Sequence, residues 1–448
     1  MSVYLTAPVP RTTMPGGIPY IIANEAAERF SFYGMRAILV VFMTRYLLDS
    51  SGTLAVMSEE DAKGWYHLFV SAVYLTPLLG ALLSDGVLGK FRTIILLSLV
   101  YCAGHFVLAR DDTRWGLAVG LGLIALGAGG IKPCVSSHLG DQFGRSNQGL
   151  LARAFSWFYF AINLGAFVSS LATPWLLQHY GSAVAFGLPG ILMLTATLIF
   201  WAGRYQFVHV PAGGRRFLKE VFSRTGLGAL GRLAVVYLFV AVFWALFDQT
   251  GSSWVLQAER MDRLLFGVEL LPAQIQAANP LLVMLLIPVF SYLVYPAIDR
   301  IFPLTPLRKI TIGLFVAAAA FAIPTAVQAS IDAGGTPSIG WQLLAYVVLT
   351  AAEVMVSITC LEFSYTQAPK NMKSFVMAFF MLSISLGNLF TSGVNFFIRE
   401  ADGSSKLEGA EYFIFFTLLM LVTAVLFMLL ARFYRGQTYV NEERPATV

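Results

Sequence analysis

The chain has 448 residues, of which 57% are hydrophobic and only 12% are charged, and its mean hydropathy is +0.71. This composition leaves too little polar surface to cover a water-soluble globule, so we expect a polytopic membrane protein. The net charge of +5 comes from basic residues scattered through short segments, which is the usual orientation signal of membrane proteins and argues against a nucleic-acid partner. The three cysteines predict neither a disulfide framework nor a metal site, and no cleaved signal peptide is expected.

Twelve apolar segments reach the length of about 20 residues that a membrane span needs. They predict an all-α membrane protein with spans at 18–48, 63–88, 93–110, 115–139, 150–177, 183–203, 232–256, 274–298, 307–329, 339–367, 373–398 and 410–434. The longest polar interval carries five basic residues and divides the spans six and six. With the N-terminus inside, 19 of the 30 Lys and Arg residues lie on the inner side and 8 on the outer side, so we expect both termini in the cytoplasm.

Two halves of six spans joined by a basic segment are typical of the major facilitator fold, in which the halves rock about a central site. We therefore expect two six-helix bundles with a linker and a tail. The predicted limits are 1–203 for the N-terminal bundle, 204–231 for the cytoplasmic linker, 232–434 for the C-terminal bundle and 435–448 for the cytoplasmic tail.

The first span carries four charged side chains, Glu25, Glu28, Arg29 and Arg36. A charge at mid-bilayer costs about 2.5–3.5 kcal/mol on insertion scales, so such residues need a reason to be there. At about 100° per residue they fall on one helical face together with Phe32. They can therefore line a shared aqueous cavity or pair with one another instead of meeting lipid. This pattern indicates a transport pathway.

The end of the second span resembles a loop motif of the major facilitator superfamily. Asp85 is followed by Gly89, Lys90 and Arg92. In that motif the aspartate accepts hydrogen bonds at a neighbouring helix N-terminus in one conformation, which implies a gating role for Asp85. The alternative is an ordinary basic turn with incidental glycines.

The segment EAAERFSFYGMR at 25–36 closely resembles the first-helix motif of the proton-dependent oligopeptide transporter family. Further signatures of that family follow in the correct order at 129–133, 158–165, 243–249 and 361–369. The resemblance extends from about residue 20 to residue 434. It implies a symporter that imports di- and tripeptides across a plasma membrane, is driven by the proton gradient without a cofactor, and works as a monomer.

A small peptide is a zwitterion, so its site needs a cationic group for the carboxylate and an anionic group for the ammonium. Arg36 and Lys132 are the cationic candidates in the N-terminal half, and Glu353, in the apolar tenth span, is the anionic candidate in the C-terminal half. A bound peptide would then bridge the halves and couple occupancy to closure. Alternatively, Arg36 and Lys132 pair with Glu25 or Glu28 and only hold helices together.

Proton coupling needs a carboxyl group whose affinity for a proton changes during the transport cycle. Glu25 and Glu28 beside Arg29 provide this chemistry, because an adjacent guanidinium favours the ionised form and its departure favours the neutral one. His67 is a further candidate, since the segment around it resembles animal members of the family. Its alternative role is that of a hydrogen-bonded packing residue.

Side-chain pockets for many peptides should be roomy and apolar, with a few polar groups. The candidates for contact with the peptide are Tyr33, Tyr74, Phe158, Asn163, Trp244 and Asn279. Glu362 and Tyr365, near the inner end of the tenth span, are candidates for gating. The sequence departs from the family at Phe32, where a tyrosine is common.

Two rival functions share these features. One is transport of nitrate or of peptide-like drugs, and nitrate, which lacks an ammonium, should be insensitive to Glu353. The other is a drug exporter in which protons and substrate move in opposite directions. An enzyme is not expected, because the sequence shows no nucleophile and base pair, metal cluster or phosphate loop.

Overall fold

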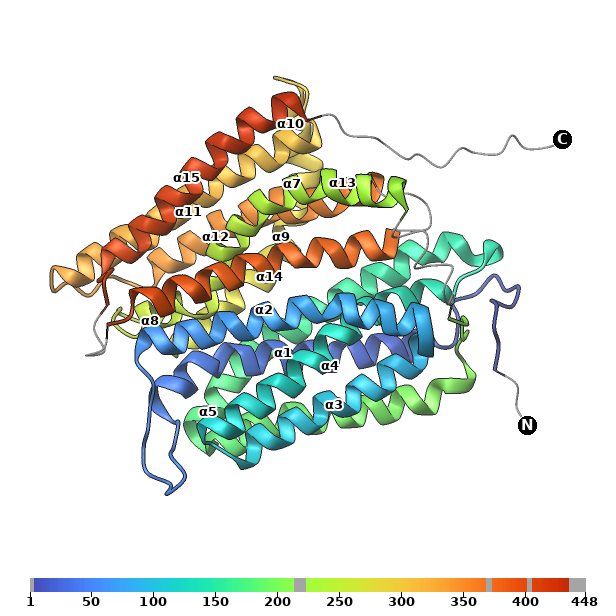
Figure 1. The fold of residues 1–448 in the computed structure, drawn as a ribbon, viewed down its shortest axis with the longest axis horizontal. Helices are drawn as coiled ribbons and strands as arrows, with labels where there is room; N and C mark the ends of the chain where they lie inside the picture. The colour runs from blue at the N-terminus through green and yellow to red at the C-terminus, as the bar shows by residue number, and fades with distance from the viewer. Residues whose placement is uncertain (1–3, 213–222, 368–372, 401–404, 435–448) are drawn as a thin grey trace.

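The computed structural model describes residues 4–212, 223–367, 373–400 and 405–434, apart from the side chains of Thr225, Tyr365, Lys373 and Ser374 (Figure 1). The α-helices of the N-terminal half are α1 (Ile18–Arg45), α2 (Glu59–Leu83), α3 (Lys90–Arg110), α4 (Arg114–Asp141) and α5 (Leu151–Ala202). Those of the C-terminal half are α7 (Arg224–Phe247), α8 (Ser253–Ala258), α9 (Ala278–Val289), α10 (Tyr295–Asp299), α11 (Pro306–Asp332), α12 (Gly340–Glu353), α13 (Thr359–Thr366), α14 (Lys373–Ile398) and α15 (Ala410–Phe433).

Shorter elements connect these helices. Turns of π-helix at Ser84–Leu88, Phe290–Val294 and Val354–Ile358 continue α2, join α9 to α10 and join α12 to α13. Turns of 3₁₀-helix lie at Arg145–Leu150, Gly203–Tyr205, Asp248–Gly251 and Pro272–Ala277. Strands β1 (Leu264–Leu265) and β2 (Val268–Glu269) pair antiparallel in a small hairpin.

The predicted all-α membrane fold with twelve spans is confirmed. Within the described residues, ten helical stretches are long and apolar enough to cross a membrane. One of them covers two spans, because α5 bends at Gly181, whose φ of 77° suits glycine. The remaining span is α1, which its internal charges keep out of the ten.

The seventh span begins earlier than the sequence predicts. Helix α7 starts at Arg224, within the interval 204–231 that we expected to be a linker. The Ser223 side chain accepts a hydrogen bond from the Gly226 backbone N–H, which caps the helix there. The polar residues before 232 therefore extend a membrane helix.

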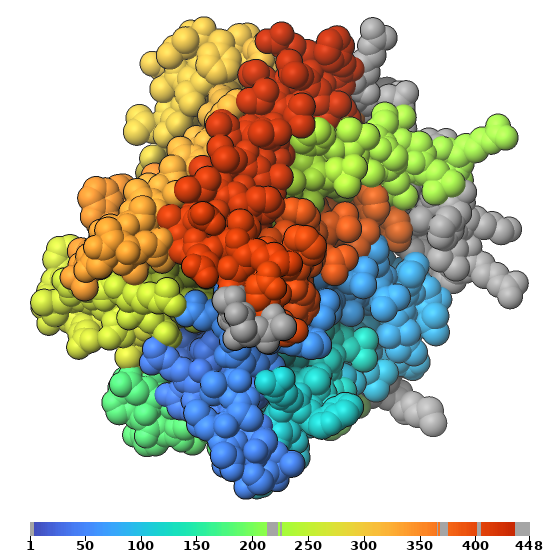
Figure 2. Space-filling view, turned by 60° about the vertical axis from the view of Figure 1, so that its left-hand side comes forward, coloured from blue at the N-terminus to red at the C-terminus, as the bar shows by residue number. Residues whose placement is uncertain are grey.

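Two hydrophobic cores correspond to the two halves of the spans. One lies almost entirely between Ile18 and Phe207, and the other between Leu233 and Phe427. In Figure 1, α1 to α5 lie below and most helices of the C-terminal half lie above, with α2 and α14 side by side between them and α8 level with α2 at the left. Figure 2 shows the same division, with the blue-to-cyan part below and the orange-to-red part above. Small residues let helices approach closely, as at Gly80, where an added Cβ would lie 2.5 Å from the Cα of Gly130.

The bundle has two distinct ends. At the terminal end, on the right of Figure 1, α1 and α7 begin and α15 finishes. At the opposite end lie residues 46–58 and the β1–β2 hairpin, and we call it the hairpin end. Three ion pairs join the halves at the hairpin end: Arg45 with Glu259 (2.6 Å), Arg260 with Glu59 (2.5 Å) and Arg399 with Asp61.

Candidate functional site

A cavity of about 290 Å³ lies between the two halves. Both halves supply polar and aromatic side chains to its wall. Those from the N-terminal half are Tyr33, Arg36, Tyr74, Tyr159, Asn163 and Ser170, and those from the C-terminal half are Trp244, Asp248, Thr250, Gln276, Asn279, Tyr346 and Glu353. A ligand in this cavity would touch both halves at once.

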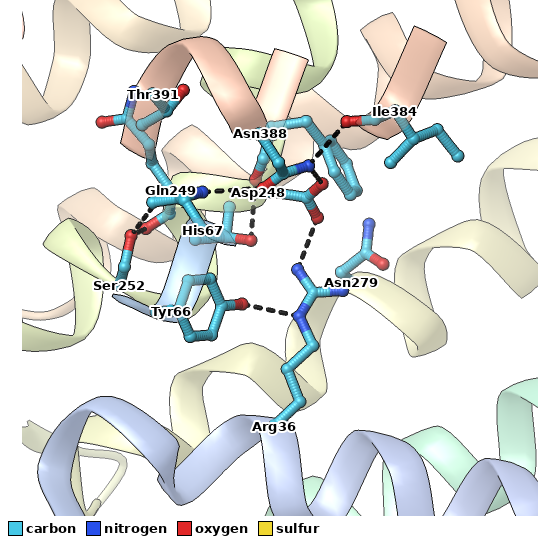
Figure 3. A network of polar contacts seen from close by, with 12 residues as sticks. Arg36, Tyr66, His67, Asp248, Gln249, Ser252, Asn279, Ile384, Asn388 and Thr391 are labelled. Carbon is cyan, nitrogen blue, oxygen red and sulfur yellow. Dashed lines mark hydrogen bonds and ion pairs between the residues drawn. The ribbon is translucent and has the colours of Figure 1, made fainter. Parts of the chain in front are cut away.

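Arg36 crosses the interface between the halves. Its Nη2 atom donates to Asp248 Oδ1 over 2.5 Å, and its Nε atom donates to the Tyr66 hydroxyl over 2.6 Å (Figure 3). Arg36 and Asp248 are both buried, and Asp248 directly follows the end of α7. Arg36 therefore pairs with the C-terminal half, and not with Glu25 or Glu28.

Glu353 also lines the cavity, at the end of α12. Its Oε2 atom accepts a hydrogen bond from Asn279 Nδ2 over 2.7 Å, and the same amide donates to the Thr350 hydroxyl over 3.2 Å. A π-helical turn begins at the next residue. The structure thus brings a cation from one half and an anion from the other to one cavity, and π-helical turns of this kind are common at functional sites.

Glu25, Glu28 and Arg29 form a buried charge cluster on α1. Arg29 Nε lies 2.7 Å from Glu25 Oε1, to which it donates, and 3.3 Å from Glu28 Oε2. Neither carboxylate oxygen of Glu28 accepts a hydrogen bond from the described residues. The predicted pairing within α1 is therefore present, with Glu28 as its less satisfied member.

Lys132 is buried beside aromatic rings. Its Nζ atom lies 3.6 Å from the centre of the Phe32 ring and 5.0 Å from that of the Tyr74 ring. This Nζ atom forms no hydrogen bond with the described residues, and Lys132 does not line the cavity. Contact with the face of an aromatic ring stabilises a cation, so Phe32, at the position where the family commonly has tyrosine, holds the ammonium by its ring.

His67 belongs to a buried network that links the halves at some distance from Glu25 and Glu28. Its Nδ1 and Nε2 atoms lie 2.7 Å from Asn388 Oδ1 and 2.8 Å from Ser252 Oγ. The Asn388 amide in turn donates to Asp248 Oδ2 over 2.6 Å. Figure 3 shows these groups continuing to Arg36 through Asp248. His67 is therefore coupled to Arg36 and not to the charge cluster on α1.

The other predicted residues fall into two groups. Five of them line the cavity, namely Tyr33, Tyr74, Asn163, Trp244 and Asn279. Phe158 does not, because its side chain is buried in the core of the N-terminal half and packs edge-on against Phe155.

Two of the predicted gating residues, Asp85 and Glu362, do not line the cavity. Asp85 accepts a hydrogen bond from the Ser84 hydroxyl over 3.3 Å, in the π-helical turn after α2. Glu362 lines a separate pocket with Lys309 and Asp299. Tyr365 lies in α13, and its side chain is outside the described part of the structure.

A family model described as the POT family matches residues 91–229 and 224–412 of this chain. The chain is 38% identical to Peptide transporter family 1 of Drosophila melanogaster over 375 residues, which are 73% of this chain and 49% of that protein. It is 36% identical to solute carrier family 15 member 2 of Homo sapiens over 396 residues, 77% of this chain and 53% of that protein. The chain belongs to the POT family.

Solved POT family structures agree with this membership. The POT family transporter PepTSo has a TM-score of 0.84 to this chain with 38% sequence identity, over 94% of this chain and 99% of that one. An auto-inhibited POT family peptide transporter has a TM-score of 0.85 with 38% identity, over 96% and 99%. The chain spans about half the length of the curated relatives it matches, and nearly all of these solved structures.

Three residues of the network around Arg36 in this POT family chain were not predicted from the sequence. Asp248 and Tyr66 contact Arg36 directly, and Asn388 contacts Asp248. Asp248 stands at the end of the apolar seventh span, where the rule that singled out Glu353 applies equally. Tyr66 and Asn388 carried no such signal, because buried hydroxyl and amide groups are common in membrane helices.

Proposed function

We propose that the chain is a proton-coupled symporter of di- and tripeptides that works by alternating access. The observation that carries this proposal is the cavity between the halves, which Arg36 of the N-terminal half and Glu353 of the C-terminal half both line. An extended dipeptide is about 7 Å long and carries opposite charges at its ends. A peptide with its carboxylate at Arg36 and its ammonium at Glu353 would satisfy both, and the family names of the relatives agree with such a substrate.

The peptide carboxylate would share Arg36 with Asp248 or replace Asp248 as its partner. Either exchange links substrate occupancy to the contact between the halves. Lys132 adds positive charge on the N-terminal side, and Asn279 orients Glu353 from α9. Tyr33, Tyr74, Asn163 and Trp244 would bound the side-chain space.

The charge cluster on α1 would couple the proton. Glu28 lacks a hydrogen-bond donor among the described residues, so a proton on either of its oxygens would relieve a buried and poorly satisfied charge. Glu25 and Arg29 would exchange partners as Glu28 changes its charge. His67 would link opening and closing of the hairpin end to Arg36 through its hydrogen bonds with Asn388 and, beyond it, Asp248.

The moving units would be the bundles at 1–203 and 232–434, with Asp85, Glu362 and Tyr365 acting at the terminal end. The expected setting is a plasma membrane with both termini in the cytoplasm, and one chain would enclose the whole pathway. With the termini in the cytoplasm, the ion pairs at the hairpin end would hold the protein in a state closed toward the outside.

The test is uptake of labelled dialanine into proteoliposomes that hold the purified protein, under an inward proton gradient. We expect accumulation that disappears when an ionophore collapses the gradient. Uptake that persists after the ionophore collapses the gradient would reject proton coupling. Accumulation only under an outward proton gradient would indicate an exporter. Uptake of nitrate without uptake of dialanine would show that nitrate, and not a peptide, is the substrate.

A further inference from the structure

Two rows of buried polar side chains lie inside the N-terminal half, and neither row lines the cavity. One row follows a face of α1 and the other follows a face of α3, each with spacings of three and four residues. All six side chains belong to residues with 0% exposure. The row on α1 is Asn24, Glu28 and Ser31, and the row on α3 is Ser98, Tyr101 and His105.

The two rows converge on the same stretch of α5. Ser31 Oγ donates to the Pro189 carbonyl over 2.5 Å, and His105 Nδ1 lies 2.9 Å from the Phe186 carbonyl. Phe186 and Pro189 are three residues apart, so they lie on one face of that helix. The Tyr101 ring lies 4.9 Å from the His105 ring. The row on α1 and the row on α3 therefore both reach one segment of α5.

Seven polar atoms of the two rows form no hydrogen bond with the described residues. They are both amide atoms of Asn24, both carboxylate oxygens of Glu28, Ser98 Oγ, the Tyr101 hydroxyl and His105 Nε2. Buried polar atoms in native proteins nearly always have partners, and ordered water supplies the partner where the protein does not. A buried water needs two to four polar partners, and the unpartnered atoms of the two rows are of the kind that supplies them.

Glu28 belongs both to the polar row on α1 and to the charge cluster with Glu25 and Arg29. At about 100° per residue it sits on α1 between the face of Asn24 and Ser31 and the face of Glu25 and Arg29. Arg29 Nε lies 3.3 Å from Glu28 Oε2, on the side of the charge cluster.

We propose that the two polar rows enclose a buried site for ordered water, that this water donates hydrogen bonds to Glu28, and that Tyr101 is the residue that positions it. The inference rests on the proposed role of Glu28 in proton coupling. The peptide cavity and its residues are not involved. Tyr101 would act through water and through Glu28, so it is a positioning residue.

The surroundings of Glu28 determine how the site should respond to pH. The titratable and charged groups around it are Glu25, Arg29 and Tyr33 on α1, Tyr101 on α3 with His105 one turn further, and Lys132 on α4. Donors to a carboxylate stabilise its ionised form. Removal of the Tyr101 hydroxyl should therefore shift the pH dependence of proton-driven uptake upward.

The test compares Tyr101→Phe with wild type, with Ser98→Ala as a second variant and Tyr180→Phe as a control. Tyr101→Phe removes only a buried hydroxyl, whereas Tyr180 is exposed at the hairpin end. Gradient-driven dialanine uptake is measured as a function of pH, and exchange of labelled dialanine is measured without a gradient. Infrared difference spectra of the purified protein, acid minus neutral, report the carboxyl band that Glu28→Gln identifies.

We expect Tyr101→Phe to move the pH of half-maximal uptake upward by about one unit, the size of one hydrogen bond to a charged group, while exchange without a gradient is retained. The Glu28 carboxyl band should move to higher wavenumber as hydrogen bonds are lost, and Ser98→Ala should act in the same direction. The proposal is overturned if Tyr101→Phe lowers uptake equally at every pH and leaves the band in place. Absence of proton-driven uptake in wild type would reject the proposed function instead, and the infrared band would then decide on the water site by itself.

Discussion

At the scale of single residues, the ion pair of Arg36 and Asp248 is a buried contact between the two halves. The two residues are 212 positions apart in the sequence. A buried pair gains little net stability, because desolvation offsets most of the attraction. Loss of one partner, by contrast, leaves the other charge buried and uncompensated, and typically costs about 3–5 kcal/mol. The pair is therefore a sensitive contact between the halves.

Asp248→Asn should impair transport strongly. The substitution keeps the shape of the side chain and removes the charge that holds Arg36, so the state closed at the hairpin end loses stability. We expect the initial rate of dialanine uptake to fall about tenfold or more, since each 1.4 kcal/mol is a factor of ten. Glu411→Gln, at an exposed position early in α15, is the matched control. Equal uptake by the two variants would remove Asp248 from the mechanism.

The sequence predicted some of these residues and not others for a simple reason. A charged residue within an apolar span can be recognised from the sequence alone, as Glu25, Glu28, Arg36 and Glu353 were. The sequence does not show which charges of different helices pair, because that pairing is decided by how distant helices pack. Periodicity places Arg36 on a helix face but cannot say that Asp248 lies opposite.

At the scale of elements, apolar length located all twelve spans but not the irregularities inside them. The eighth and tenth spans were predicted as continuous helices, and both contain a π-helical turn. One extra residue in a turn leaves composition and length unchanged, so hydropathy does not detect it. The turn at Val354–Ile358 follows Glu353 directly and helps to set where that side chain projects.

At the scale of elements, Gly387 is a position where two helices pack too closely to admit a side chain. It lies on α14 against α7, and an added Cβ would overlap the carbonyl oxygen of Ala241 and approach the Ala245 nitrogen to 2.8 Å. Backbone atoms cannot move aside, so Gly387→Ala should lower the melting temperature by about 2–6 °C, which corresponds to an overpacking cost of about 1–3 kcal/mol.

Gly393→Ala is the control for this prediction, because it makes the same change on the same helix with nothing within 4 Å of the new Cβ. It should leave the melting temperature unchanged or raise it, since alanine favours helix over glycine. Thermal unfolding in detergent measures both variants. Equal melting temperatures would show that α7 and α14 are free to separate.

At the scale of the whole molecule, the three ion pairs at the hairpin end hold the halves together around a cavity. Their side chains are partly exposed, so each pair contributes only about 0.2–1 kcal/mol. Together with the buried contact of Arg36 they favour closure without making it permanent, as a transporter requires.

The triple variant Arg45→Gln, Arg260→Gln and Arg399→Gln should open the hairpin end more often. Spin labels at Leu54 and Leu264, one on each half and both exposed, would report the distance between the halves. We expect a larger population at long distance than in the Arg114→Gln control, which changes an exposed arginine of the N-terminal half alone. Identical distance distributions would mean that these pairs do not determine closure.

In the proposed binding mode, Glu353 receives the peptide ammonium while Arg36 receives the carboxylate. The most direct test is the binding of dialanine and of N-acetyl-dialanine, which lacks that ammonium, to wild type and to Glu353→Gln by titration calorimetry. Acetylation should weaken binding to wild type about tenfold or more and should change little in Glu353→Gln, because the partner is already gone. An equal loss in both proteins would contradict the claim and place the ammonium elsewhere.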